Sequence, residues 1–449
     1  MELSVGLLSI ALVDLVLGYI LYQNTWHPLA SVPGPFLARL TRLWLVKHSW
    51  DGDMHTTMIE LHKKYGNLVR TGPNEVSVCE LAAVKQIYGA GTRFRKSNWY
   101  SVFQGHRKFD IFAERDEQIH AAQRRLVSRA YSVEALKDLE SEVDSAIGVF
   151  LNCMRHQQDR IVDMAKWVQL FAFDVIGDVT FSKRFGFMVA GSDDGSIKQI
   201  NAALKCAAWI GQVSWLYWLH DALMPYIGNH LAITVRHGSI RNFAVKEIAA
   251  RQDRAVERKD ILSKLRATQK EKPLELDDVA VTSMATSNIF AGSDTTAIST
   301  RAIIYYLLKN PSCKQRLVGE LLTLRDQGKL SDPVTMAEAE KISYLQAVMY
   351  EALRLHPAVG MNIPRVAPPG GANIAGVHVP GGTIVGVNPW VLHRNRDVFG
   401  EDVEAFRPER WMGEKQGDMH RFFFAFGSGA RTCMGRNLSW IEMWAHQRN

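Results

Sequence analysis

The most regular hydrophobic feature of the chain is an apolar run from Leu3 to Tyr22, which is interrupted only by two serines and Asp14. Its length matches the ~20 residues that a helix needs to cross a bilayer. A charged residue in mid-span costs about 2.5–3.5 kcal/mol on insertion scales, and the many Leu, Ile and Val residues can offset that cost. We therefore expect residues 1–24 to form a transmembrane signal anchor.

A cleaved signal peptide is the main alternative for this run. Such a peptide would have basic residues before the apolar stretch and a small-residue cleavage site after it, and only Glu2 precedes the run here. The nearest basic residues follow it, at Arg39, Arg42 and Lys47. The positive-inside rule then leaves the N-terminus in the lumen and the rest of the chain in the cytosol.

The remaining pattern predicts one mainly α-helical body with small β-sheets. Pro33-Gly34-Pro35 cannot continue a helix, so residues 25–36 are expected to form a rigid Pro/Gly hinge, and residues 37–449 a single domain. Periodicity and turn signals predict a hairpin over 68–80, a strand pair at 377–379 and 383–387, and helices over 278–308 and 341–355.

Composition narrows the function classes. The 449 residues carry a formal net charge of +7 without a basic block containing interleaved aromatics, so nucleic acid is not an expected partner. The five Cys are an odd number with no C-x-x-C pair, so the sequence suggests neither a disulfide framework nor a zinc ribbon. Walker, dinucleotide, zincin and nucleophile-elbow signatures are all missing from the sequence.

Cys433 lies in the most informative segment, which runs from Phe426 to Gly435 with the sequence FGSGARTCMG. A thiol is a strong metal ligand only as the thiolate. Glycines let the backbone turn tightly and bring N–H groups near the sulfur, and Arg431 supplies a nearby cation. The alternative is an inert buried thiol, which is the better interpretation for the other four cysteines. These are Cys79, Cys153, Cys206 and Cys313.

A second polar motif, Ala291-Gly-Ser-Asp294-Thr295-Thr, falls in the middle of the predicted helix over 278–308. A glycine costs about 1 kcal/mol in a helix interior, so we expect Gly292 to let a bulky ligand approach the backbone. The Thr hydroxyl can bond back to the preceding turn, and the adjacent carboxylate can pass protons. A polar stripe on a surface helix is the alternative.

Glu351 and Arg354 stand at i and i+3 on the next predicted helix, and Arg410 follows in the segment FRPERW. A surface ion pair, worth well under ~1 kcal/mol, is the alternative for the first two residues.

Together these motifs resemble the cytochrome P-450 family in order and spacing. The resemblance implies a P-450 fold and a haem-thiolate monooxygenase, with heme b iron as cofactor. It implies that Cys433, within the loop from Phe426 to Gly435, is the axial ligand and that Asp294 and Thr295 handle protons. The remaining matched residues would hold the haem propionates (His120, Arg124, Arg365 and Arg431) or form a structural charge network (Glu351, Arg354 and Arg410).

The same resemblance implies partners and a location. Since the chain lacks a nucleotide fingerprint, NADPH-derived electrons are expected to come from a separate flavoprotein reductase, and the substrate is expected to be an apolar small molecule. A single-pass position in the endoplasmic reticulum membrane is expected. Segments such as KYG at 64–66 and VRTGPNE at 69–75 are similar to the fungal secondary-metabolism branch near pisatin-demethylase-like enzymes.

The sequence departs from the family pattern at its end, where 16 residues (449 − 433) follow Cys433. The family usually continues the next helix and adds a β-hairpin, so the C-terminus is expected to be truncated. Two alternatives to a monooxygenase therefore remain: a non-catalytic haem-binding remnant, and a haem-thiolate isomerase or dehydratase. Enzymes of the latter kind often lose the threonine that stands here at Thr295.

Overall fold

The computed structural model describes residues 2–228, 239–252 and 259–448. The chain forms two compact units, each built from three separate stretches. The first comprises Met1–Val102, Lys205–Gly228 and Gly360–Leu392, and the second comprises Phe103–Leu204, Asn229–Val359 and His393–Asn449. The single domain over 37–449, with its hinge and anchor boundaries, stays a prediction.

A five-stranded sheet is the centre of the first unit, with the strand order β1-β2-β7-β4-β3. The predicted hairpin is confirmed, because β1 and β2 pair antiparallel with Val69 opposite Ser77. A separate two-stranded sheet pairs β5 with β6. The strands are β1 (Leu68–Gly72), β2 (Glu75–Val78), β3 (Arg95–Lys96), β4 (Ile363–Val366), β5 (Ala372–Ile374), β6 (Val377–Val379) and β7 (Ile384–Val387).

The predicted pairing of 377–379 with 383–387 is wrong, although both strands exist. A two-residue turn at Ala375-Gly376, both with positive φ, folds β6 back on β5 instead. Strand β7 then enters the large sheet between β2, to which it is parallel, and β4, to which it is antiparallel. This pairing depends on β2, which lies some 300 residues earlier in the chain, so the local sequence pattern around β7 cannot predict it.

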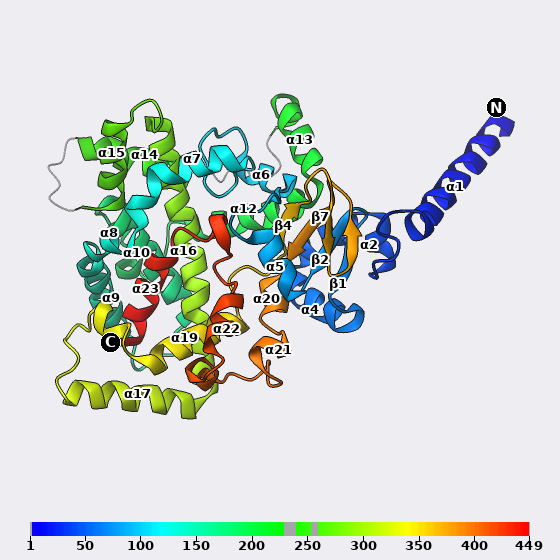
Figure 1. Ribbon diagram of the computed structural model, residues 1–449. Coiled ribbons are helices and arrows are strands. Elements are labelled where there is room, and N and C mark those ends of the chain that lie inside the picture. Colours follow the sequence, from blue (N-terminus) through cyan, green and yellow to red (C-terminus); the bar gives the residue numbers. More distant parts are fainter. Residues whose placement is uncertain (1, 229–238, 253–258, 449) are drawn as a thin grey trace. The chain divides into compact units, whose positions relative to one another are not determined.

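The apolar run forms helix α1, from Glu2 to Thr25, which projects from the sheet of the first unit (Figure 1). Among the described residues, Leu7–Thr25 is the one stretch long and apolar enough to cross a membrane, with a mean hydropathy of 1.5. Its side chains are almost all exposed, as expected of a surface that meets lipid rather than protein.

A buried arginine joins α1 to the sheet. Arg70 on β1 is fully buried, and its guanidinium donates to the carbonyl oxygen of Gln23 (2.8 Å) and to that of Pro73 (2.7 Å). It also donates to the side-chain Oε1 of Gln23 (2.5 Å). Gly34 lies so close to this strand that a Cβ atom there would come 2.2 Å from the carbonyl oxygen of Arg70. The 25–36 segment is therefore packed against β1.

The other helices of the first unit surround this sheet, and two helices cross the boundary between the units. Those within the unit are α2 (Phe36–Leu40), α3 (Leu43–Asp51), α4 (Met54–Tyr65), α5 (Leu81–Tyr88), η1 (Asn98–Tyr100), η3 (Gly211–Val213), α13 (Ser214–Ile227) and α20 (Pro389–Leu392). Those that cross it are α6 (Ser101–Gln104) and α12 (Ser196–Ile210).

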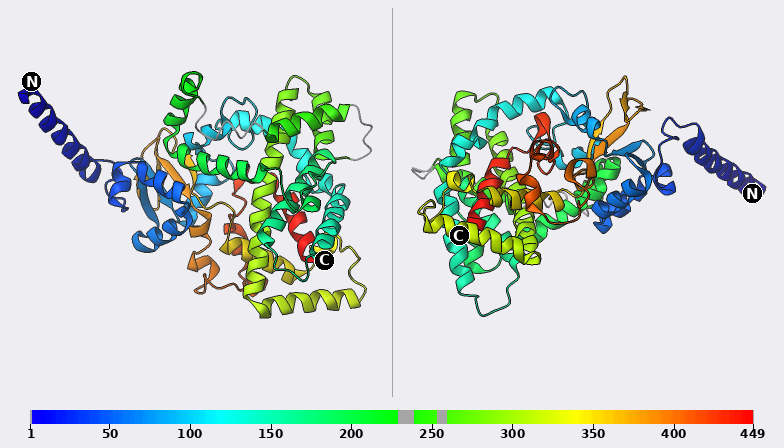
Figure 2. Two further views of the ribbon diagram at one scale, coloured as in Figure 1. Left: turned by 180° about the vertical axis from the view of Figure 1, so that it is seen from behind. Right: turned by 60° about the horizontal axis from the view of Figure 1, so that its bottom comes forward.

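The second unit is helical and is built on α16, which runs from Asp278 to Lys309 and confirms the predicted long helix. Asp277 caps its first turn by accepting from the backbone N–H of Ala280, and Pro311 follows its end. Helices α10 (Met164–Phe181) and α23 (Arg436–Arg448) pack along α16 (Figure 2).

The remaining helices of this unit complete its core. The predicted helix over 341–355 is α19, which begins two residues later, at Ser343. The others are α7 (Glu117–Val127), η2 (Ser128–Tyr131), α8 (Val133–Lys137), α9 (Glu140–Arg155), α11 (Phe187–Ala190), α14 (Ser239–Gln252), α15 (Ile261–Glu271), α17 (Pro311–Asp326), α18 (Met336–Ala339), α21 (Arg396–Phe399), η5 (Pro408–Met412), α22 (Gln416–Phe422) and η6 (Gly429–Arg431).

Candidate active site

The loop before α23 presents Cys433 at the N-terminal end of that helix. Gly427 and Gly429 both have positive φ, which lets the chain turn back so that the N–H of Cys433 donates to the carbonyl of Phe426 (2.9 Å). Helix α23 begins three residues later, at Arg436. A helix N-terminus favours negative charge, so this position suits a thiolate.

Two opposing influences act on the Cys433 thiol. Burial by the surrounding protein raises the pKa of the thiol above its usual value, and the backbone N–H groups of Gly435 and Arg436 and the guanidinium of Arg124 oppose this rise without cancelling it. The residue is nonetheless exposed, so its sulfur is accessible. The site therefore offers an accessible sulfur surrounded by donors and cations that stabilise its ionised form.

Over the described residues, no group of three His, Cys, Asp or Glu side chains could hold a metal ion. A haem iron takes most of its ligands from the porphyrin and needs only an axial ligand from the protein. The donor set at this loop, one thiolate with N–H groups around it, fits that kind of cofactor.

The motif Ala291–Thr296 lies in mid-α16, as expected, and Thr295 is exposed there with its hydroxyl donating to the carbonyl of Ala291 (2.8 Å). A Cβ at Gly292 would come 2.7 Å from Cδ1 of Ile176 on α10, so the glycine admits a neighbouring helix. The approach of a ligand to this turn stays a prediction. The motif is close to α23, because Thr296 and Ser439 share a hydrogen bond of 3.2 Å.

Asp294 is half-buried on the same turn. Burial raises the pKa of its carboxyl, and the guanidinium of Arg301 and a hydrogen bond from the Gln169 side chain oppose that rise. Asp294 thus combines partial burial with polar partners, and the net effect is a raised pKa of its carboxyl.

Glu351, Arg354 and Arg410 meet in one fully buried network. Arg354 donates to both carboxylate oxygens of Glu351 (2.8 and 2.9 Å), and Arg410 donates to Oε1 (2.9 Å). The indole of Trp411 donates to Oε2 (2.8 Å), and the backbone N–H of Arg407 donates to Oε1 (3.0 Å). The carboxylate is therefore satisfied on every side, as a buried charge requires.

Sequence reasoning missed His393, which connects this network to the segment before the Cys433 loop. The side chain is fully buried and stacks on the ring of Phe423. Its Nδ1 lies 3.0 Å from the carbonyl of Arg354, and the backbone N–H of Phe424 donates to its Nε2 (2.7 Å). An apolar stretch ending in WVLH marks a buried histidine, but nothing in it reveals these partners.

Of the four residues expected to hold the haem propionates, three belong to the second unit and Arg365 belongs to the first. Arg431 is ion-paired with Glu117 (2.8 Å) and also donates to the carbonyl of Glu114 (2.8 Å). Arg124 is half-buried beside Cys433 and Arg431, and His120 on the same helix is buried. Arg365 is buried in the first unit, where it lies over the ring of Tyr88.

Phe426 packs against the aromatic side chains of Phe423 and Trp440, and the guanidinium of Arg436 lies over its ring. The loop thus has a rigid apolar base on one side of its cysteine.

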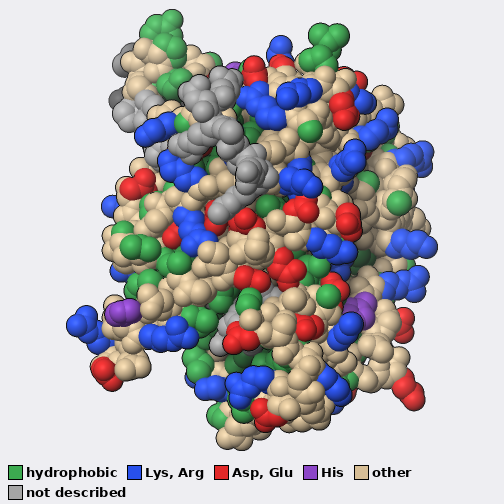
Figure 3. All heavy atoms as spheres, turned by 90° about the vertical axis from the view of Figure 1, so that its left-hand side faces the viewer, with side chains coloured by type: hydrophobic (Ala, Val, Ile, Leu, Met, Phe, Trp, Pro, Cys, Tyr) green, Lys and Arg blue, Asp and Glu red, His purple; other side chains and the backbone are tan. Residues whose placement is uncertain are grey.

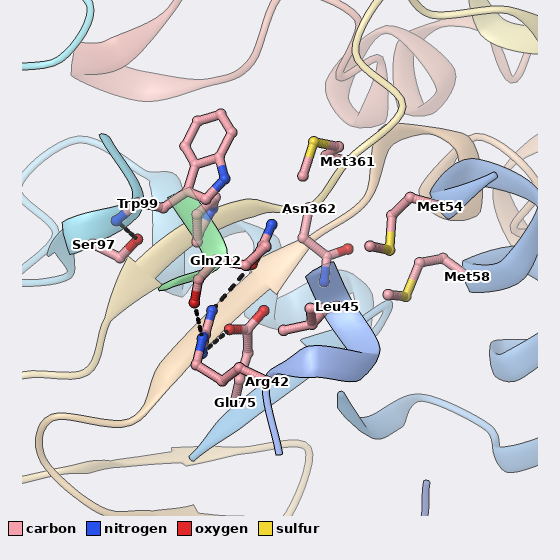
Figure 4. Close-up of a pocket in the computed structure, with 11 residues that line it drawn as sticks. Arg42, Leu45, Met54, Met58, Glu75, Ser97, Trp99, Gln212, Met361 and Asn362 are labelled. Carbon is pink, nitrogen blue, oxygen red and sulfur yellow. Dashed lines mark hydrogen bonds and ion pairs between the residues drawn. The ribbon is translucent and has the colours of Figure 1, made fainter. Parts of the chain in front are cut away.

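The first unit contains a small methionine-lined cavity (Figure 4). Arg42 lies at its edge between the carboxylate of Glu75 (2.8 Å) and Gln212. Met361 lines it together with Met54 and Met58. Its volume of about 20 Å³ is room for about one water molecule, so it is not a substrate site by size.

Comparison with known proteins identifies related sequences. The family model described as cytochrome P-450 matches residues 32–445. The cytochrome P-450 monooxygenase hepC of Aspergillus oryzae is 40% identical over 446 residues, covering 95% of this chain and 87% of its own length. The monooxygenase cicH of Emericella nidulans is 37% identical, covering 93% and 86%. Pisatin demethylase of Fusarium vanettenii is 34% identical, covering 97% and 85%.

Proposed function

Because the chain belongs to the cytochrome P-450 family, we propose that Cys433 ligates its haem iron and that the enzyme oxidises an apolar small molecule of fungal secondary metabolism. The family makes the protein a haem-iron monooxygenase. The observation that supports the ligand assignment is the position of Cys433 at the start of α23, with the N–H groups of Gly435 and Arg436 directed to its sulfur.

A bound thiolate-ligated haem supplies dioxygen activation and the transfer of one oxygen atom to the substrate. The protein must bind this group, keep its sulfur ionised and supply protons. The N–H donors at Cys433 hold charge on the sulfur and thereby tune its strength as a ligand. His120, Arg124, Arg365 and Arg431 are the cations that we propose for the two propionates, and use of Arg431 requires its guanidinium to be shared with, or released from, Glu117.

Asp294 and Thr295 are the residues that we propose for proton delivery. The exposed Thr295 hydroxyl can hold a proton at its Oγ1, and the adjacent Asp294 carboxyl, whose pKa is raised by burial, can replace it from water. Glu351, Arg354 and Arg410 do not touch the reaction in this proposal. They fix the segment that leads to the Cys433 loop.

We propose a flavoprotein reductase as the source of NADPH-derived electrons and a single-pass position in the endoplasmic reticulum membrane through α1. The basic residues that follow α1 support a cytosolic body. On the face of the molecule in Figure 3, Lys and Arg side chains are spread among Asp and Glu rather than gathered in one block. Association with an acidic partner is therefore expected to depend on several weak, salt-sensitive contacts.

The test of the ligand assignment is the carbon-monoxide difference spectrum of the reduced 449-residue chain in microsomes. The expected result is a red-shifted thiolate Soret band that is lost in Cys433→Ser. Cys153→Ser is the matched control, because the introduced serine hydroxyl can still donate to the carbonyl of Met188. This substitution should leave the band unchanged. A band that survives in Cys433→Ser would overturn the assignment.

A further inference from the structure

A line of polar side chains crosses the interface between α10 and α16 in the second unit. Gln169 on α10 is buried, and its side-chain Nε2 donates to the backbone carbonyl of Ser293 (3.3 Å). The Gln169 side chain also forms a hydrogen bond with the carboxylate of Asp294. Its Oε1 accepts from Nη2 of Arg301 (3.2 Å), whose Nε donates to the carbonyl of Ala297 (3.1 Å).

The same two helices also make an apolar contact beside these polar side chains. Val168 and Ala172 on α10 pack against Ala297, with Met164 and Ile304 at the edge. A buried amide and a half-buried guanidinium are costly in such surroundings unless each is hydrogen-bonded, and here each satisfies the other. Their hydrogen bonds therefore direct two polar groups toward the Asp294 turn.

The line also leads to solvent. Asp163, the exposed N-cap residue of α10, attracts the Arg301 guanidinium electrostatically. Asp163 in turn lines an open surface cavity of about 530 Å³ together with Lys166 and Trp167. Arg301 thus interacts electrostatically with Asp163 at the surface and is hydrogen-bonded to Gln169, which reaches the Asp294 turn.

We propose that Gln169 and Arg301 are positioning residues for Asp294, which orient its carboxyl toward the Thr295 turn and connect it to solvent at Asp163. This inference rests on the proposed proton-delivery function of Asp294. Arg301 is the charged group that acts on Asp294, and Asp163 and Asp294 are the charged groups that act on Arg301. Removing Arg301 therefore leaves Asp294 without its cation and makes its carboxyl a weaker acid.

The first test is a double-mutant cycle of Arg301→Gln and Asp294→Asn in the haem-loaded, full-length protein, with the thermal midpoint as readout. The electrostatic attraction between Arg301 and Asp294 exists only while the Asp294 carboxyl is ionised. We therefore expect Arg301→Gln to lower the midpoint at pH 8, to lower it less at pH 5, and to have no pH-dependent effect in the Asp294→Asn background. Equal effects in both backgrounds would overturn the proposal.

The second test separates positioning from plain packing. With the reductase, the fraction of NADPH electrons lost to peroxide should follow a pH profile displaced upward by about half a unit or more in Arg301→Gln. Arg301→Lys, which keeps the positive charge, should reverse part of this displacement. Gln169→Leu replaces Arg301→Gln as the test variant if Arg301→Gln does not fold. Arg266→Gln is the matched control, because Arg266 on α15 is the partner of the exposed Asp278, which lies on the same helix as Arg301.

The outcomes distinguish the two proposals. If Thr295→Ala and Asp294→Asn do not increase peroxide, the proton-delivery function is wrong. If they do, and the pH profile in Arg301→Gln and Gln169→Leu equals that of wild type, Gln169 and Arg301 only join the helices and the positioning role is overturned.

Discussion

At the residue scale, His393 is held by two hydrogen bonds that only one neutral tautomer can make. Nδ1 must carry the proton to donate to the carbonyl of Arg354, and Nε2 must be free to accept from Phe424. Burial and the nearby Arg354 guanidinium lower the pKa of His393 to about 3. Protonation in the folded state would break the bond from Phe424, which lies nine residues before Cys433.

This histidine makes stability fall in acid. The unfolded chain protonates it near pH 6.5, whereas the folded chain resists until about 3, so stability is lost progressively between these values. The slope from this residue is at most about 1.4 kcal/mol per pH unit. His393→Gln keeps a donor and an acceptor but cannot titrate, so its unfolding free energy should vary less between pH 6.5 and 4. An unchanged slope would contradict this.

Glu351 is the residue on which two buried cations depend. Glu351→Ala leaves Arg354 and Arg410 without their carboxylate, which we expect to cost about 3–5 kcal/mol and to yield protein without haem. Haem content per polypeptide is the measurement. Glu401→Ala removes the exposed partner of Arg396 in the same stretch and should change stability by less than about 1 kcal/mol. Normal haem content in Glu351→Ala would refute the structural role.

At the element scale, α10 and α16 approach closely because Gly292 faces Ile176. Gly292→Ala should cost about 1–3 kcal/mol through overpacking, since the new Cβ would lie 2.7 Å from Cδ1 of Ile176, and should gain about 1 kcal/mol in helix propensity. The net change is therefore expected to be a destabilisation of up to about 2 kcal/mol. Ile176→Ala should relieve the clash in the double variant. Gly148 on α9 and Gly319 on α17 have open space instead, so alanine there should stabilise by about 0.4–1 kcal/mol. Chemical denaturation measures all four variants.

Local motifs were predictable because their chemistry depends on neighbours in the sequence. The Cys433 loop and the long helix over 278–308 belong to this group, and both have local signals in glycine placement and periodicity. The pairing of β7 with β2, the partners of His393 and the contact of Gln169 with the Asp294 turn were not predictable. Each joins segments far apart in the chain, and the residues involved have ordinary local surroundings.

At the scale of the whole molecule, the junction between α1 and the sheet of the first unit determines how α1 is attached to the rest of the chain. Arg39 is the first basic residue of the chain, and its guanidinium bonds to Asn24 (3.4 Å) and to the carbonyl of Val32 (3.3 Å). Trypsin can therefore separate α1 from the body only at Arg39 or beyond, inside a segment held by hydrogen bonds and by Arg70.

Weakening this junction should expose it to protease. Gln23→Ala removes a side-chain acceptor of Arg70, and we expect trypsin to release the body from microsomes several-fold faster than in wild type. Thr25→Ala is the matched control, because its hydroxyl bonds only to its own helix, at Leu21. Equal release rates for the two variants would show that Arg70 does not hold the junction.

The buried guanidinium of Arg70 also bears on attempts to make a soluble form of the enzyme. Deleting the first 25 residues would remove both oxygen atoms of Gln23 that accept from it and leave a buried cation short of acceptors. If the shortened protein aggregates, the cause would then be the lost hydrogen-bond acceptors of Arg70 rather than the lack of lipid. Replacing Arg70 with methionine, which fills similar space without charge, is the compensating change to make alongside the deletion.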